Sequence, residues 1–335
     1  MKIERISANE VNNLRGYLEG VNTPIIITDL FKSWPALEIA KNSDEKILRY
    51  LINHAKPRLV DTLIIDDKYN GLIGYTDDTF KSYTFKKYDA PFSSVIKKMI
   101  IDLKSNDKTK VAVQSALIKE CLTSFLDKNP SPDFLKDIEP RIWLGNSASV
   151  PGHYDCDYNI ALNLCGKRTF YLLPTESIND IYVAPIDKSI TGPAISLVDF
   201  EQPNLKKFPK FSKVKDDVLK ASLNEGEALF IPPLWWHNVK ATERINILIN
   251  YWWKDEVSNK ILGCDPSDSL LHSILTIRHL PTEQKESWKK LFDHYIFENT
   301  KYSKNEDEGC NSILDGDINQ MKMAFEAIKE KLKTN

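Results

Sequence analysis

The sequence predicts a mainly β domain, built as a sandwich or barrel, followed by a helical region. Between residues 141 and 253, short runs rich in β-branched and aromatic residues alternate with Gly, Pro and Asn. Closely spaced short strands of this kind are typical of sandwiches and barrels. After Lys254 the apolar residues recur at intervals of three and four, which is the spacing of one helix face.

The strands and helices expected in the first part follow from local composition. The predicted strands are 25–28, 141–144, 168–173, 228–231 and 245–252. Residues 8–20 and 44–54 are predicted to be helical, and 91–130 to combine helical patterning with polar connections.

Three helices are expected in the last part of the chain. Asp265 and Pro266 suit the N-cap and first position of one helix, and a second follows Pro281. A third, near 317–333, carries apolar residues in a single stripe, and the polar stretch 305–316 is predicted to be a loop.

Composition limits the class of protein. A formal charge of −2 argues against binding nucleic acid through the overall field, although a local basic patch stays open. The five cysteines form no CxxC pair, which favours a reducing compartment. The N-terminal segment has no apolar core of a secretory signal, and no window is apolar for the ~18 residues of a membrane span. We therefore expect a cytoplasmic protein with no membrane contact.

The segment Pro151-Gly-His-Tyr-Asp155 carries the most informative pattern in the chain. On a strand, residues i and i+2 face the same way, so His153 and Asp155 can present an imidazole and a carboxylate together. A second histidine, His237, follows Trp235-Trp236 at the start of another expected strand. Two His and one carboxylate on one face of a metal ion are typical of non-haem Fe(II) oxygenases, because they leave positions open for other ligands.

Each part of this pattern is weak when taken alone. Most H-x-D triplets are surface or turn residues, and a single histidine after two tryptophans is more often packed than ligating. The combination is stronger, because a barrel can bring the two strands together.

Several segments resemble the JmjC-type, cupin-like family of Fe(II)- and 2-oxoglutarate-dependent oxygenases. They are TPIIITDLFKSWPA (23–36), GHYDCDYNIALNLCGKRTFYLLP (152–174), LNEGEALFIPPLWWHNV (223–239) and INYWWKD (249–255). The resemblance covers roughly residues 20–255. It is to the small hydroxylase branch, which includes the asparaginyl hydroxylase of hypoxia-inducible factor and the tRNA wybutosine-synthesis hydroxylase. The stretch PNLKKFPKFSKV (203–214) is most similar to the tRNA-modifying member.

The resemblance implies a double-stranded β-helix, or jelly roll, with an N-terminal α/β elaboration and a C-terminal helical appendage. It implies an oxygenase domain at 1–254 with its β-helix core at about 139–254. Residues 255–335 would form a helical region of the kind that pairs two subunits in this family, so a homodimer is expected. His153, Asp155 and His237 match the family's iron ligands.

The resemblance also implies a binding site for 2-oxoglutarate. The family anchors its distal carboxylate with a basic residue two positions after a glycine, here Arg168 after Gly166, with Lys167 as the alternative. Neighbours on a strand face opposite ways, so only one of these two side chains can point inward. Asn159 and Asn250 match asparagines that line the pocket. Val150 stands where the family often has Thr or Ser; Ser147 or Ser149 could substitute, or one hydrogen bond is missing. Trp143 is either a pocket wall or a core aromatic.

The implied reaction uses 2-oxoglutarate and O2 to hydroxylate a C–H bond, and it yields succinate and CO2. We expect a protein or peptide side chain as substrate, since that activity is the commonest in the branch. The alternative of an RNA nucleoside rests on six lysines between 206 and 220, interleaved with Phe208 and Phe211, which could otherwise be a solvated loop. A metal-binding cupin-like module without catalytic activity is the alternative of a different class.

Overall fold

A computed structural model describes residues 3–105, 109–190, 192–254, 265–298 and 312–334. The chain divides into two compact units, Met1–Trp253 and Lys254–Asn335.

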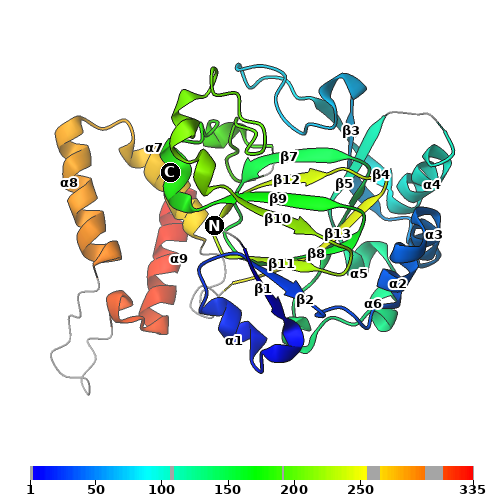
Figure 1. The fold of residues 1–335 in the computed structure, drawn as a ribbon. Helices are drawn as coiled ribbons and strands as arrows, with labels where there is room; N and C mark the ends of the chain where they lie inside the picture. The colour runs from blue at the N-terminus through cyan, green and yellow to red at the C-terminus, as the bar shows by residue number, and fades with distance from the viewer. Residues whose placement is uncertain (1–2, 106–108, 191, 255–264, 299–311, 335) are drawn as a thin grey trace. The chain divides into compact units, whose positions relative to one another are not determined.

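The first unit is built on two β-sheets (Figure 1). One has nine strands in the order β1-β2-β11-β8-β13-β6-β5-β3-β4, and the other has four in the order β10-β9-β12-β7. The strands are β1 Glu4–Ser7, β2 Ile25–Thr28, β3 Leu59–Ile65, β4 Phe85–Pro91, β5 Lys110–Leu117, β6 Arg141–Gly145, β7 Ala148–His153, β8 Tyr158–Cys165, β9 Arg168–Leu173, β10 Leu219–Leu223, β11 Ala228–Ile231, β12 Trp236–Ala241 and β13 Asn246–Trp253. This architecture confirms the predicted mainly β fold with a jelly-roll core.

The central strands of the large sheet are buried on both faces. Ile160, Leu162 and Leu164 of β8 belong to the core under the helices, whereas Ala161 lies in the core between the two sheets. Since successive side chains alternate, a strand covered on both sides has a nearly continuous apolar sequence. The inter-sheet core also contains Phe170 of β9, so the two sheets face each other across it.

Helices cover the outer face of the large sheet (Figure 1). The helices of this unit are α1 Leu14–Glu19, α2 Pro35–Asn42, α3 Asp44–His54, α4 Phe92–Asp102, α5 Ile118–Cys121 and α6 Phe125–Lys128. Leu48 and Phe92 are fully buried in the core that joins these helices to the sheet. Ser43 caps α3 by accepting a hydrogen bond from the Lys46 N–H, so this helix begins where the sequence predicts.

The predicted strands are all present, but the prediction for 91–130 is wrong in one respect. Residues Lys110–Leu117 form β5, which pairs with β3 and β6. Its β-branched residues Val111 and Val113 favour a strand, yet the run is short and the apolar helix α4 comes just before it. The strands β3 and β4 were also not predicted.

Residues 174–218 cover the outer face of the small sheet. They contain the 3-10 turns Thr175–Asn179, Ile186–Lys188, Pro209–Lys213 and Lys215–Asp217. Phe200, Phe208 and Phe211 from this insertion pack with Trp236 of β12 in a separate apolar core.

The second unit is helical in its described residues. Its elements are α7 Pro266–Ile277, α8 Thr282–Phe292, a π-helical turn Asp293–Phe297, a 3-10 turn Ile313–Asp315 and α9 Ile318–Thr334. Asp265 caps α7 through the Ser267 N–H, as predicted. Of the predicted loop 305–316, residues 305–311 lie outside the described part. Within the described residues, no helix has both the length and the apolar content for a membrane crossing.

Candidate metal centre and anion pocket

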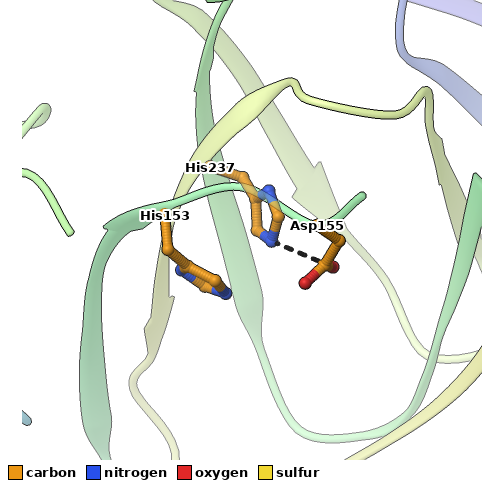
Figure 2. Close-up of side chains that lie close together, drawn as sticks. All are labelled: His153, Asp155 and His237. Atoms are coloured by element: carbon orange, nitrogen blue, oxygen red, sulfur yellow. Dashed lines mark ion pairs between the residues drawn. The ribbon is translucent and has the colours of Figure 1, made fainter. Parts of the chain in front are cut away.

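The fold brings His153, Asp155 and His237 together in one cluster (Figure 2). One ligand atom from each residue lies within 4.8 Å of the other two. His237 Nε2 is 3.6 Å from Asp155 Oδ2, and the centroids of the two imidazole rings are 4.2 Å apart. Nitrogen and oxygen donors at these separations can converge on a single divalent ion.

A β-bulge turns His153 towards His237. Across the antiparallel β7–β12 pair, His153 is the Cα partner of His237 and Val150 is the partner of Val239, so three steps on β7 match two on β12. The extra residue reverses the alternation, and both Val150 and His153 face the space between the sheets. Pro151 lies inside the bulge, where its missing N–H costs no ladder hydrogen bond.

Asp155 is not on a strand, which corrects the expectation that one strand would carry both ligands. β7 ends at His153, and the chain then leaves the sheet. The Asp155 backbone carbonyl accepts a hydrogen bond from the Leu234 N–H at 2.8 Å. A contact between two loops, and not the hydrogen bonds of a sheet, therefore holds the backbone of Asp155. Leu234 adopts the left-handed conformation, with φ of 66°.

The hydrogen bonds of both histidines leave Nε2 available as a ligand atom. His153 Nδ1 is 2.9 Å from the Pro151 carbonyl, and His237 Nδ1 is 2.9 Å from the Trp235 carbonyl. A carbonyl only accepts, so each Nδ1 carries the proton and each Nε2 keeps its lone pair. Burial, together with the neighbouring His153, lowers the pKa of His237 to about 4, so its imidazole is neutral at pH 7.

Two side chains bind the Asp155 carboxylate, and a third side chain binds one of these two. Its Oδ2 accepts hydrogen bonds from Asn159 Nδ2 at 3.0 Å and from Trp252 Nε1 at 3.2 Å. Asn250 Nδ2 in turn donates to Asn159 Oδ1 at 2.7 Å. The two asparagines singled out from the sequence thus lie beside the carboxylate. The Trp252 contact was missed, although Trp252 follows Asn250 by two positions and shares its face of β13.

Arg168 points into the space between the sheets, and Lys167 does not. Arg168 is 9% exposed and follows a tight turn in which Gly166 has φ of 83°, a conformation that favours glycine. Lys167 is exposed on the outside, which removes it as a candidate for the interior. Burial lowers the pKa of Arg168 to about 10, which still leaves its guanidinium charged at pH 7.

A cavity of about 40 Å³ adjoins Arg168, comparable with the share of one water in the liquid, about 30 Å³. Trp143 and Val150 line it, and the side chain of Ser149 faces the opposite side of β7. The Nε atom of Arg168 and the Nε1 atom of Trp143 are both buried with no hydrogen-bond partner in the described parts of the chain.

The lysines between 206 and 220 do not form the aromatic-interleaved patch that the sequence suggested. Phe208 and Phe211 are buried in the core of the insertion. Lys207 forms an ion pair with Asp78 at 2.9 Å, and Lys213 pairs with Asp180 at 3.2 Å. The two phenylalanines therefore stabilise the insertion and are not available to stack on bases.

Comparison with known proteins places the chain in a family. Residues 15–259 match the cupin-like domain family. The chain is similar to JmjC domain-containing protein D of Dictyostelium discoideum, with 28% identity over 260 residues, which are 71% of this chain and 54% of that protein. It is similar to lysine-specific demethylase JMJ30 of Arabidopsis thaliana, with 24% identity over 267 residues, 76% of this chain and 56% of that protein. HSPB1-associated protein 1 of Rattus norvegicus is 30% identical over 118 residues, 34% of this chain and 24% of that protein.

The protein therefore belongs to the cupin-like family of JmjC type, whose members are typically 2-oxoglutarate-dependent oxygenases. The chain spans about half the length of two of these relatives, 54% of JmjC domain-containing protein D and 56% of JMJ30.

Proposed function

We propose that this protein is an Fe(II)- and 2-oxoglutarate-dependent oxygenase in which His153, Asp155 and His237 bind the iron. The donor set fits this metal, because two imidazoles and one carboxylate would occupy one face of the ion and leave its other coordination positions open. The histidine tautomers fit as well, since both Nε2 atoms are free to bind. The hydrogen bonds from Asn159 and Trp252 orient the carboxylate, as outer contacts do around metal sites.

The observation that carries this proposal is the buried Arg168. No carboxylate in the described residues forms an ion pair with its guanidinium, although the side chain is almost fully buried. An unpaired buried charge costs several kcal/mol, so the site is built to receive an anion. Arg suits a carboxylate in particular, because its planar fork can donate two parallel hydrogen bonds.

The position of Arg168 relative to the metal cluster fits 2-oxoglutarate. Arg168 lies on the same strand face as Leu172, which is the Cα partner of His237. Four residues of strand span about 13 Å. An extended Arg side chain and a five-carbon dicarboxylate can bridge this distance together, with the distal carboxylate at Arg168 and the 2-oxo acid group at the metal.

The residues of the chain would orient the reactants and exclude water. When bound, iron and 2-oxoglutarate supply the oxidation, in which 2-oxoglutarate loses CO2 to give succinate and one oxygen atom of O2 enters a substrate C–H bond. His153, Asp155 and His237 fix the metal, and Arg168 fixes the cosubstrate. The apolar residues between the sheets, including Phe170, keep bulk water from this space.

A protein or peptide side chain is the substrate class that we propose. Three of the relatives are named as lysine-specific demethylases: JMJ30 and JMJ31 of Arabidopsis thaliana and the lysine-specific demethylase 8 of Xenopus tropicalis. Another is named for its association with the protein HSPB1. Hydroxylation of an N-methyl carbon, followed by loss of formaldehyde, would be demethylation by the same chemistry. Hydroxylation of an RNA nucleoside would also use this site, but burial of Phe208 and Phe211 removes the aromatic part of its support.

Cosubstrate turnover tests the chemistry. Purified protein with Fe(II) under air should convert 2-oxoglutarate to succinate, and H237A and D155A should abolish this conversion. The exposed His279 gives a matched control, because H279A removes an imidazole far from the cluster in sequence and should keep full turnover. No succinate from the wild-type protein, with peptide or RNA present, would favour a cupin-like module without catalytic activity.

Product analysis separates the substrate classes. Peptides and RNA from the same cells should be incubated with the protein and examined by mass spectrometry. A peptide gaining one oxygen atom supports hydroxylation, loss of a methyl group with formaldehyde release supports demethylation, and an oxidised nucleoside supports the RNA alternative.

The remaining proposals concern organisation. We propose that residues 1–254 form the oxygenase domain, that 255–335 pair two copies of the chain, and that the protein is cytoplasmic. Support for pairing comes from the described helices of the second unit. Neither α7 nor α8 buries a residue, and Leu275, Trp288 and Leu332 are 72%, 44% and 60% exposed. Apolar helix faces of this kind are stable in water only when something covers them.

A further inference from the structure

The indole N–H of Trp143 is a buried hydrogen-bond donor without an acceptor in the described residues. Trp143 lies on β6, beside its Cα partner Leu248 on β13. Its Nε1 atom has no hydrogen-bond partner in the portion of the chain that the structure describes. Indole nitrogen only donates, and buried donors in native proteins are nearly always paired. This N–H therefore indicates a ligand atom that accepts.

Trp143 lines the cavity of about 40 Å³ described above, and Arg168, which carries the second unpaired donor, lines it too. Both residues line it, and most of its other wall is apolar, including Val150, Val239 and Ala241. The polar Asn146 at its edge is already engaged, since its side chain accepts from the Val111 N–H and donates to the Thr109 carbonyl. The two residues that carry these unpaired N–H donors thus line one small cavity, and both donor atoms are buried beside it.

We propose that Trp143 and Arg168 bind the distal carboxylate together, with the indole N–H donating to one oxygen and the guanidinium to the other. This inference rests on the proposed function and assigns Trp143 a direct contact with the cosubstrate. It makes Trp143 a specificity residue, because its hydrogen bond exists only with an acid that carries a second carboxylate. The ring of Trp143 is held edge to face against Trp252, with centroids 6.4 Å apart and planes at 82°, so its N–H direction is fixed.

Binding measurements with two acids test this contact. The full chain, loaded with Mn(II), is titrated calorimetrically with 2-oxoglutarate and with 2-oxobutanoate, which keeps the 2-oxo acid group but lacks the distal carboxylate. The variant W143F removes the N–H and keeps an aromatic, though smaller, ring. We expect W143F to weaken 2-oxoglutarate binding about tenfold, the effect of one hydrogen bond to a charged group, and to leave 2-oxobutanoate binding unchanged.

The control is W253F, because the Trp253 N–H donates to Glu19 Oε1 and lies outside the cavity. It should leave the binding of both acids unchanged. Equal weakening of both acids by W143F would show a structural role and overturn the proposal, as would an unchanged affinity for 2-oxoglutarate. If R168Q weakens 2-oxoglutarate binding and W143F does not, only this inference fails. If the wild-type protein does not distinguish the two acids, the proposed function fails with it.

Discussion

His153 and His237 are Cα partners across the β7–β12 pair, and their rings lie 4.2 Å apart between centroids. The pairing depends on the bulge between Val150 and His153, because an unbroken alternation would turn His153 to the outer face. The geometry of the candidate metal centre is therefore a property of the sheet register as much as of the ligand residues.

The first prediction concerns the glycine of this bulge. A Cβ at position 152 would lie 2.5 Å from Phe200 Cζ, far inside the optimum of about 3.5–4.0 Å for packed carbons. Phe200 is buried and cannot swing away. We expect G152A to lower the free energy of unfolding by about 1–3 kcal/mol and to weaken metal binding, measured by denaturant titration and by Co(II) titration.

The matched control for this variant is G20A. A Cβ at Gly20 would make only ordinary contacts, 3.5 Å from the Gly16 and Tyr17 carbonyl oxygens. G20A should change neither the free energy of unfolding nor the affinity for Co(II). Metal binding as tight in G152A as in the wild type would show that the bulge geometry tolerates a side chain there.

The second prediction concerns Trp252 as a positioning residue for Asp155. W252F removes the donor 3.2 Å from Asp155 Oδ2 and keeps an aromatic, though smaller, ring. A hydrogen bond to a charged group contributes about 1.5 kcal/mol, so Co(II) affinity should fall roughly tenfold. The absorption bands of bound Co(II) should also shift, since the carboxylate is freer to rotate, and a merely structural role would leave the bands in place. Unchanged bands and affinity would contradict the role assigned to Trp252.

The third prediction is a pH dependence of the metal-free protein. The pKa of His237 is lowered to about 4 in the folded chain, against about 6.5 when unfolded. Between these values the unfolded chain binds more protons, so the free energy of unfolding should fall as the pH decreases from about 6.5 to about 4. In H237Q this slope should be smaller, as measured by denaturant titration at several pH values. Equal slopes in both proteins would count against a buried, neutral His237.

The fourth prediction concerns the second unit. The double variant I328D/L332D places charges on apolar side chains of α9 that are 55% and 60% exposed. If these residues pair two copies of the chain, light scattering should show a dimer for the wild type and a monomer for the variant. Deleting residues 317–335 should have the same effect. K322D alters an exposed lysine of the same helix and should keep the wild-type mass. The same oligomeric state in all four proteins would exclude pairing through α9.

The sequence predicted the fold class because its central strands carry strong local patterns. The run from Ala228 to Ile231 is apolar at every position, and the structure buries all four residues. β3 and β4 were not predicted because their burial depends on distant partners. Lys86 and Lys87 of β4, for example, pair with Ile64 and Leu63 of β3 at the edge of the sheet.

The candidate site was predictable in its residues but not in its local structure. Spacing and residue type pointed to His153, Asp155 and His237, and the resemblance to the cupin-like family added Arg168. The bulge and the exit of the chain before Asp155 could not be foreseen, because both depend on contacts with β12 and with Leu234. The same holds for the Trp252 hydrogen bond, which joins residues 97 positions apart.

Calorimetric titration of 2-oxoglutarate into the full chain, with and without Mn(II), tests most directly whether a metal at His153, Asp155 and His237 and a carboxylate at Arg168 form one site. Binding should be tight only with the metal present, should be lost in H237A, and should weaken in R168Q but not in the neighbouring K167Q. Binding that needs neither the metal nor Arg168 would contradict a joint site.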